Sequence, residues 1–418
     1  MHFHTRTSCR ICGSSNLTPV LSLGEQFVSN FVDEATADNA LKAPLELVLC
    51  EASSGGCGLL QLRHTVQADL MFRRYWYRSG INASMAAALQ DVADQAEKLV
   101  HLGKGDVVVD IGCNDGTLLR SYKTRGLTLV GFEPATNLIE FAQVGTSKIV
   151  NDYFNLGSFR EHFGDSKAKL ITSIAMFYDL DEPNEFVDDI VHVLDRDGVW
   201  ILQMNYLPSM LRQNAFDNIC HEHLEYYSLS SLEALLDRHD LDVFDVELND
   251  VNGGSFRVYA KHRLCKSVGN QNDSKNRVAR LRKLEADMYL WDRRIYLEFA
   301  SRITLLGQKV RRFIESECQK GKRIYVYGAS TKGNTLLQFW RLDHRLLVAA
   351  ADRNPDKWGR KTIGTQIPVI SEEQARAERP DYFLVLPWHF LDEFMKREQA
   401  FLSAGGKFIV PLPEFRLI

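Results

Sequence analysis

Two stretches of this 418-residue chain have the pattern of a buried strand, a glycine turn and a helix start. The first covers residues 107–116, where three valines precede Asp110 and Gly112, and the second covers residues 324–333. Apolar runs of this kind are typical of parallel strands that are covered on both faces, and glycine lets the backbone approach a ligand closely. The sequence therefore predicts an α/β fold that contains two Rossmann-like units.

Further apolar runs extend both units. Runs at 127–132, 149–150, 170–174 and 199–202 predict more strands of the first unit, and runs at 348–351, 382–386 and 407–410 predict those of the second. Residues 266–322 have helical spacing and connect the two. The predicted organisation is a small module at 1–72, a first α/β domain at 73–262, a helical connector at 263–322 and a second α/β domain at 323–418.

Four cysteines near the N-terminus have the spacing of a metal site. Cys9 and Cys12 form a C-x-x-C pair, and Cys50 and Cys57 form a second pair with a longer gap. Two thiolate pairs from separate turns suit tetrahedral Zn²⁺ in a closed structural site. The sequence predicts that these four cysteines bind one structural zinc ion, with four free thiols as the alternative.

Charge and hydropathy exclude several classes of partner. The chain has 50 basic and 54 acidic residues, so its net charge of -4 gives no basic field for nucleic acid or an acidic membrane. No run of about 18 apolar residues occurs, and the first residues lack the apolar core of a signal peptide. We expect a cytoplasmic protein with reduced cysteines. The sequence leaves the oligomeric state open, with a monomer as the simplest form.

The first glycine turn has the pattern D-x-G-x-N-x-G rather than G-x-G-x-x-G. Glu133 ends the next strand, where a carboxylate is placed to accept the hydroxyls of a ribose. Asp152 follows the third strand and can accept from an adenine amino group. This combination resembles class I S-adenosylmethionine-dependent methyltransferases more than nicotinamide dehydrogenases. The residues predicted to bind the cofactor are Asp110, Gly112, Asn114, Gly116, Glu133 and Asp152.

The second glycine turn carries Lys332 at the start of a predicted helix. Exposed amides at a helix N-terminus together with a lysine suit a phosphate group. The turn lacks the glycine spacing of a Walker loop. Phosphate binding and simple packing both remain open for it.

Residues 220–223 place four groups that exchange protons in consecutive positions, as Cys-His-Glu-His. They do not match the zinc-protease pattern, in which two histidines lie one helical turn apart. A histidine or carboxylate held by neighbours can act as a general base. Taken alone, the segment is either structural or catalytic.

These motifs, in this order, resemble the nucleotide-sugar C-methyltransferase family, including C-3'-methyltransferases of deoxysugar biosynthesis. The resemblance covers essentially the whole chain and extends to residues 252–257, 386–390 and 411–414. It implies a class I (Rossmann-like) methyltransferase domain flanked by a zinc-binding module and a C-terminal α/β domain that binds a nucleotide sugar. The implied partner is a nucleoside-diphosphate keto-sugar, and the implied cofactors are S-adenosyl-L-methionine and structural Zn²⁺.

The resemblance also implies the chemistry: a proton next to a keto group is removed, and the resulting enolate takes the methyl group. His223 is the implied base, and Glu222 beside it would orient the imidazole ring or bind the sugar. Tyr77, favoured over Tyr75, would stabilise the enolate oxygen. Tyr178 stands in a region where many relatives have histidine, and it would donate a hydrogen bond to the keto oxygen.

Other residues of the implied site are less specific. Asn252, Arg257 and Lys332 are predicted sugar or pyrophosphate contacts, and His221 has a supporting place beside the substrate. Cys220 departs from the tyrosine of many relatives. Two alternatives remain: an O- or N-methyltransferase acting on the same kind of sugar, and a non-catalytic scaffold that binds nucleotide sugars.

Overall fold

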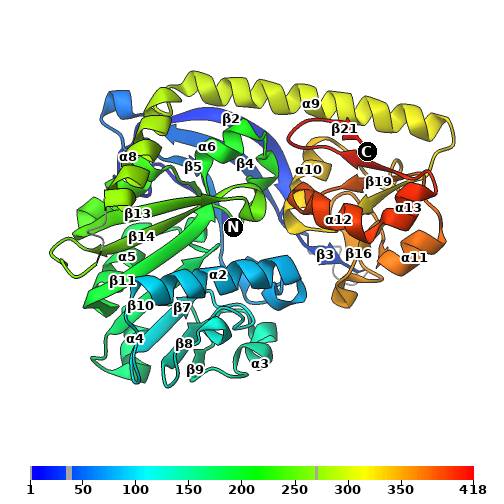
Figure 1. Cartoon of the computed structure of the whole chain (residues 1–418). Coiled ribbons are helices and arrows are strands. Elements are labelled where there is room, and N and C mark those ends of the chain that lie inside the picture. The colour runs from blue at the N-terminus through cyan, green and yellow to red at the C-terminus, as the bar shows by residue number, and fades with distance from the viewer. Residues whose placement is uncertain (1, 34–39, 269–271) are drawn as a thin grey trace.

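The computed structural model describes residues 2–33, 40–268 and 272–418. Residues 269–271, inside the predicted connector, lie outside the described residues. In the described part of the chain the strands form three larger sheets and two sheets of two strands each (Figure 1). The mixed α/β architecture expected from the sequence is confirmed.

The largest sheet has seven strands in the order β13-β14-β11-β10-β7-β8-β9. Strands β7 to β11 are parallel, whereas β14 runs antiparallel to both β11 and β13. The order reverses between β7 and β10, which is where ligands bind in open α/β sheets. The strands are β7 (Val107–Ile111), β8 (Thr128–Phe132), β9 (Lys148–Val150), β10 (Ala168–Ile174), β11 (Leu194–Asn205), β13 (Leu241–Asn249) and β14 (Ser255–His262).

Helices cover both faces of this sheet. Because side chains alternate along a strand, Val108 and Ile201 face one side and pack with α2, while Val109 and Ile171 face the other and pack with α5. This double covering explains the continuous valine run in the sequence. The helices of this unit are α2 (Ala83–Leu99), α3 (Ile139–Ala142), α4 (Leu156–Phe163), α5 (Pro183–Val193), α6 (Leu207–Arg212) and α7 (Leu229–Leu236).

The second predicted strand-turn-helix unit forms a six-stranded sheet in the order β18-β16-β15-β19-β20-β21. Its neighbouring strands are parallel, except that β21 pairs antiparallel with β20. The strands are β15 (Ile324–Tyr327), β16 (Ala350–Asp352), β18 (Val369–Ser371), β19 (Tyr382–Val385), β20 (Lys407–Val410) and β21 (Arg416–Leu417). The helices are α10 (Thr331–Phe339), α11 (Glu372–Ala377), α12 (Leu391–Arg397) and α13 (Gln399–Ser403).

The N-terminal residues form small antiparallel sheets that join both α/β units. Strands β2 (Leu17–Phe27), β4 (Lys42–Cys50) and β5 (Leu60–Leu62) form a sheet that is extended by β12 (Glu225–Tyr226), from the segment that follows His223. Strand β3 (Phe31–Val32) pairs with β17 (Lys361–Thr362) of the second unit. Strands β1 (Phe3–Thr5) and β6 (His64–Val66) pair with each other, and the short helix α1 (Asp69–Phe72) follows. The module therefore contacts both the segment around His223 and the second α/β unit.

Two helices lie in the predicted connector. Helix α8 (Asn272–Asp287) packs against β13 and so extends the first unit. Helix α9 (Arg293–Gln319) contacts β2 and runs along one edge of the molecule, over both α/β units (Figure 1). The long apolar face of α9 packs into one hydrophobic core with residues of both α/β units, and this packing holds the two units in place.

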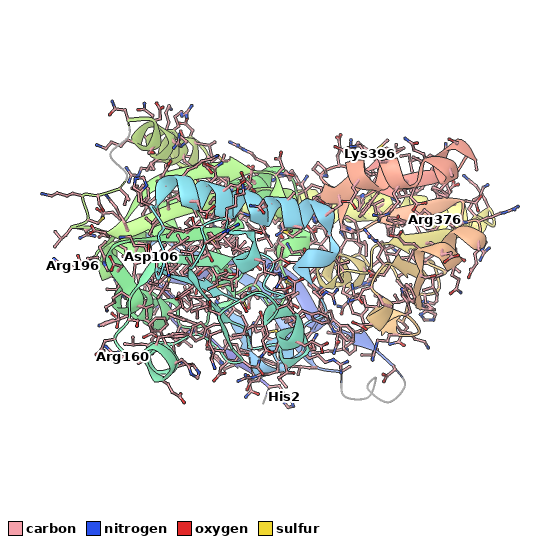
Figure 2. All side chains as sticks on the ribbon, turned by 60° about the horizontal axis from the view of Figure 1, so that its bottom comes forward. His2, Asp106, Arg160, Arg196, Arg376 and Lys396 are labelled. Atoms are coloured by element: carbon pink, nitrogen blue, oxygen red, sulfur yellow. The ribbon has the colours of Figure 1, made fainter. Side chains whose placement is uncertain are left out.

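Charged side chains of both signs lie around the outside of the protein. Figure 2 shows Arg376 and Lys396 on the second α/β unit, and Asp106, Arg160 and Arg196 on the first. Among the helices in the described ranges, none combines the length and the apolar character needed to cross a bilayer.

Candidate active site and zinc site

A cavity of about 410 Å³ opens at the carboxyl ends of β7, β8 and β10. The segment that follows α1, the segment before β12 and the start of α10 complete its wall. It therefore brings together parts of both α/β units and residues 217–226, which we name the catalytic segment after the predicted base His223. The predicted site residues that line it are Tyr77, Asp110, Gly112, Asn114, Glu133, Asp152, Tyr178, Glu222, His223, Asn252 and Lys332.

The glycine turn after β7 forms one end of the cavity. Gly112 has φ 71° and Asn114 has φ 52°, so the turn exposes backbone to the cavity. A Cβ atom on Gly112 would lie 3.1 Å from the Met176 side chain, which leaves little room for a larger residue. The Asn114 side chain accepts a hydrogen bond from the Ser79 amide at 2.9 Å, and this contact ties the turn to the segment after α1.

Glu133, at the end of β8, is held with its carboxyl group at the cavity wall. Its two oxygens accept hydrogen bonds from the amides of Asn114 and Ala135, both at 2.8 Å. Burial raises the pKa of Glu133 to about 7. Fixed carboxyl oxygens facing a cavity fit the hydroxyls of a ribose, as the sequence predicted for the cofactor.

Two other predicted cofactor residues have different surroundings. Asp110 accepts a hydrogen bond from the Thr172 hydroxyl at 2.6 Å, and burial raises the pKa of Asp110 to about 7. Asp152 is exposed at the cavity edge and pairs with Arg73 at 3.1 Å. Gly116 does not line the cavity; with φ 75°, it turns the chain where a Cβ atom would meet the Ala142 carbonyl at 2.8 Å. The structure supports a role in the turn, and contact of Gly116 with the cofactor stays a prediction.

His223 presents one ring nitrogen to the other end of the cavity. Its Nδ1 lies 2.8 Å from the Asn218 carbonyl oxygen, a contact that requires a proton on Nδ1 and leaves the lone pair on Nε2. The ring of Tyr178 packs edge-on against the imidazole, with 4.3 Å between the ring centroids. Burial, reinforced by the charge of Lys332, lowers the pKa of His223 to about 3. Near neutral pH, His223 is therefore a neutral hydrogen-bond acceptor at Nε2.

The structure bears on one of the two roles predicted for Glu222, that of orienting the imidazole; contact with the sugar stays a prediction. The Asn218 carbonyl, and not Glu222, orients the His223 ring. Burial raises the pKa of Glu222 to about 7, while the charge of Lys332 and hydrogen bonding with Tyr75 oppose this shift. The Glu222 carboxyl lines the cavity as a group that titrates near neutral pH.

The two candidate tyrosines lie at different depths. Both line the cavity, but Tyr77 is 42% exposed. Burial of its hydroxyl, and then the charge of Asp115, raise the pKa of Tyr77. The Tyr75 hydroxyl lies among Glu222, Asp179 and Tyr178, and burial raises its pKa well above the usual range. The structure thus places Tyr75, ranked second in the sequence, closer to the catalytic segment.

Lys332 comes from the second α/β unit and enters the same cluster. Its ammonium group donates to Asn218 Oδ1 at 2.8 Å. Burial lowers the pKa of Lys332, whereas Asp217, Cys220 and Glu222 raise it. The adjacent Ser330 hydroxyl caps α10 by accepting from the Gly333 amide at 3.0 Å. The turn therefore places the Lys332 ammonium beside the carboxyl groups of the catalytic segment, and phosphate binding by this turn stays a prediction.

Two carboxyl groups in this cluster were missed in the sequence. Asp179 follows Tyr178 just beyond β10, and Asp217 precedes Asn218; both line the cavity. The Trp388 indole donates to Asp217 Oδ2 at 3.2 Å. The position of Asp179 beyond a central parallel strand is the one signal that could have identified it.

His221 and Arg257, both predicted to contact the substrate, do not line the cavity. His221 Nε2 lies 2.9 Å from the Ala43 carbonyl oxygen, inside the N-terminal module. Arg257 is buried, donates to Gln203 Oε1 at 2.8 Å and pairs with Asp91 at 2.9 Å. Both side chains are occupied by structural partners, and we withdraw them from the predicted substrate contacts.

The four N-terminal cysteines converge as predicted. Their sulfur atoms all lie within 4.8 Å of one another, with Cys9–Cys57 and Cys12–Cys50 distances of 3.5 Å. The two turns close through Gly13 (φ 73°) and an equivalent glycine after Cys57. Four thiols from two turns fit a tetrahedral Zn²⁺, which would hold them as thiolates.

Arg10 connects this cysteine cluster with the catalytic segment. It lies between Cys9 and Cys12, and its side chain is fully buried. Its guanidinium donates to Asp181 at 3.2 Å and to the Leu62 carbonyl at 2.6 Å, and it lies 3.7 Å from Glu225, two residues after His223. The fold of the cysteine module therefore sets the position of the catalytic segment.

Comparisons with known proteins cover the whole chain. Residues 250–413 match the family described as the C-methyltransferase C-terminal domain, residues 77–246 match a methyltransferase domain, and residues 9–72 match a zinc binding domain. The C-methyltransferase NovU of Streptomyces niveus is 32% identical over 413 residues, which span 98% of this chain and 96% of NovU.

Solved structures resemble part of the chain. A S-adenosylmethionine-dependent methyltransferase from Clostridium acetobutylicum is 14% identical, with a TM-score of 0.34 over 42% of this chain and 92% of that protein. Magnesium protoporphyrin IX methyltransferase from Synechocystis, with bound SAH, is 13% identical, with a TM-score of 0.33 over 43% of this chain and 87% of its own.

Proposed function

Because the chain belongs to the C-methyltransferase family and is an S-adenosylmethionine-dependent enzyme with a zinc-binding module, we propose that it methylates a carbon next to the keto group of a nucleotide-linked sugar. One observation carries this proposal: the turn that fits the cofactor and the free nitrogen of His223 open into the same cavity of about 410 Å³. A methyl donor and a carbon acid therefore have room to meet beside a base.

When bound, S-adenosylmethionine supplies an electrophilic methyl group. Gly112 and Asn114 would line its amino-acid end, and Glu133 would accept its ribose hydroxyls. Asp110 and Asp152 complete the proposed contacts. Because the Asn114 side chain accepts from the Ser79 amide and the Asn114 amide donates to the Glu133 carboxylate, the shape of the turn is set before any ligand arrives.

His223 is the proposed base. Its Nε2 takes the proton from the carbon next to the keto group, and the Asn218 carbonyl keeps the other nitrogen protonated. A carboxyl oxygen of Glu222 lies within 4.8 Å of the His223 ring nitrogen. In its ionised form, Glu222 stabilises the imidazolium that results and offsets the opposing charge of Lys332.

The sugar is proposed to lie between the two α/β units. Asn252 and Lys332 border the cavity from the first and second units, and Tyr75 and Tyr77 border it from the segment after α1. These polar groups offer donors for the sugar hydroxyls and for the developing enolate oxygen. We propose that the second unit holds the nucleotide and that the reaction takes place in the cytoplasm.

The direct test uses labelled S-adenosylmethionine with a panel of nucleotide-linked 4-keto-6-deoxysugars, followed by mass spectrometry and NMR. We expect one of them to gain a methyl group on carbon. Solvent deuterium that enters the same carbon without the methyl donor would support enolisation as a separate step. Failure to methylate carbon in every member of the panel would refute the proposed substrate class.

Two alternatives give different results in the same experiment. A product that carries the new methyl group on oxygen or nitrogen would identify an O- or N-methyltransferase, which needs less base strength from His223. Calorimetry that detected no binding of S-adenosylmethionine would favour a scaffold that binds nucleotide sugars. The fixed Glu133 carboxyl group at the cavity wall argues for the enzyme.

A further inference from the structure

Asp179 occupies a fixed position where β10 meets the cavity. It ends the short 3-10 turn Phe177–Asp179, and its amide donates to the Met176 carbonyl at 3.0 Å. The neighbouring Tyr178 carbonyl accepts from the Leu224 amide at 2.7 Å, which ties this turn to the catalytic segment. The backbone therefore sets the direction of the Asp179 side chain.

The carboxyl group of Asp179 has an unused oxygen. Its Oδ1 is shielded from solvent and has no hydrogen-bond partner among the residues that the structure describes. Asp179 lines the cavity beside Glu222, His223 and Lys332. An unpartnered buried oxygen is rare in proteins, because losing its hydrogen bonds to water costs about 1–3 kcal/mol. A carboxyl group in this place is suited to meet a polar atom of a ligand.

The groups around Asp179 disfavour its ionised form. Burial raises the pKa of Asp179 well above its usual range, Glu222 and Glu225 raise it further, and Lys332 opposes them. Lys332 also interacts with Asp217, so one positive charge faces several carboxyl groups and cannot keep all of them ionised. The titratable groups that face Asp179 are Tyr75, Tyr178, Cys220, Glu222, Glu225, Tyr226 and Lys332.

We propose that Asp179 is a catalytic residue which acts as a neutral carboxylic acid and donates a hydrogen bond to the keto oxygen of the substrate. This inference rests on the proposed function and extends it. Tyr178 then acts mainly through its ring, which packs against His223 and positions the base. A protonated carboxyl group in an apolar setting is an effective donor to an enolate oxygen.

The proposed step balances. The C–H bond next to the keto group breaks, its proton goes to His223 Nε2, and its electron pair forms the enolate. The Asp179 O–H group stays intact and strengthens its hydrogen bond to the enolate oxygen. The new C–C bond then forms from the enolate, the carbon–sulfur bond of the sulfonium breaks, and its electron pair remains on sulfur. The ketone is restored, and His223 releases its proton to solvent.

The first test asks whether Asp179 is protonated, and it needs no substrate. We would compare infrared spectra of the wild-type protein and of Asp179→Asn near neutral pH. A protonated-carboxyl band that is present in the wild type and lost in the variant is expected. Asp165→Asn, which changes an exposed carboxyl group between α4 and β10, is the matched control and keeps the band. Absence of the band in the wild type would overturn the proposal.

The second test measures solvent deuterium exchange at the carbon next to the keto group. We expect Asp179→Ala to slow the exchange by about 10²–10³-fold, the effect of removing a donor to an oxyanion. Asp179→Asn, whose amide still donates, should retain more of the rate and should lose the fall in rate at alkaline pH that deprotonation of Asp179 causes in the wild type. Affinity for S-adenosylmethionine and the melting temperature should not change.

The outcomes separate this inference from the proposed function. Exchange by Asp179→Ala within about threefold of wild type would overturn the role of Asp179, even if carbon methylation is observed. If the wild type exchanged no proton of any keto sugar, the proposed function would fail, and with it the role of Asp179 in that reaction. The infrared band would still decide the protonation of Asp179.

Discussion

Within residues 2–33, 40–268 and 272–418, two clusters of side chains have the ligand types and spacing that could hold a metal ion, and they differ in what surrounds them. In both, the ligand atoms lie within 4.8 Å of one another: Cys9, Cys12, Cys50 and Cys57 in the first, and Cys220, Glu222 and His223 in the second. The first consists only of thiols on two glycine turns. The second shares its space with the Lys332 ammonium and with two more carboxyl groups.

We infer that this difference separates the zinc site from the proposed proton-transfer site. Four thiols gain most from a cation, because four thiolates together repel one another without it. In the second cluster Lys332 already supplies positive charge, and a divalent ion there would meet a like charge. It would also occupy the His223 nitrogen that the proposed reaction needs. Ligand spacing alone therefore does not define a metal site; the charge around the ligands decides.

The largest effect is expected at the first cluster. Cys50→Ser should abolish zinc binding, because the site has no spare ligand among its four thiols. Structural zinc contributes on the order of 10 kcal/mol to the folding of small modules, so the N-terminal module should unfold and the melting temperature should fall steeply. Metal analysis and thermal melting measure both. Cys318→Ser is the control and should keep its zinc; a folded, zinc-containing Cys50→Ser would contradict the assignment.

His223→Ala should act on turnover and leave the metal in place. Removal of a general base lowers the rate by about 10²–10⁴-fold. Zinc content and affinity for S-adenosylmethionine should stay as in the wild type, because neither site includes the imidazole. Steady-state kinetics and calorimetry test this pair of expectations. His101→Ala, on an exposed histidine, is the control; full turnover by His223→Ala would exclude His223 as the base.

How much of the fold and of the site the sequence predicts depends on how local each signal is. The strands of both α/β units and the cysteine cluster were predicted because their signals are local: an apolar run, a glycine turn, two cysteine pairs. Lys332 was predicted as a sugar or pyrophosphate contact, and no signal in the sequence indicated that it also reaches Asn218, which lies 114 residues earlier in the chain. Spacing within a motif carries no information about which distant segment will face it.

The catalytic segment itself shows the same limit at short range. His221 and Glu222 are neighbours in sequence, but His221 points to the Ala43 carbonyl of the N-terminal module and Glu222 points to the cavity. Neighbouring side chains outside a helix commonly face opposite sides, and only the packing of β12 on β5 decides which one faces the substrate. Asp179 was not predicted as a site residue for the same reason: the sequence does not show which side chains outside a helix will face the cavity.

A moderate effect is expected for Lys332→Met, and it is best seen in the pH profile. The charge of Lys332 favours the Glu222 carboxylate, whose pKa burial raises to about 7. Activity that needs this carboxylate rises as pH increases through about 7, so removal of the charge should shift this rise to higher pH. Turnover at neutral pH should fall about 10-fold or more.

The control for this variant is Lys396→Met, on the surface of the second unit (Figure 2). It removes the same charge and the same stem from α12, away from the cavity lining. Its pH profile of kcat/KM should match that of the wild type. If Lys332→Met also left the pH profile unchanged, the charge of Lys332 would not control the ionisation of Glu222. The electrostatic difference between the two clusters would then lose its support.

The smallest effect is expected for Cys220→Ser, the counterpart of Cys50→Ser in the second cluster. Cys220 is buried, and burial together with Glu222 raises the pKa of its thiol well above the usual range. A thiol that keeps its proton neither binds a metal nor transfers a proton at neutral pH, so the variant should keep one zinc per chain and change turnover by less than about threefold. Metal analysis and steady-state kinetics of the two serine variants, measured side by side, compare the clusters directly. Loss of a second equivalent of zinc from Cys220→Ser would mean that the cation, and not Lys332, completes the catalytic cluster.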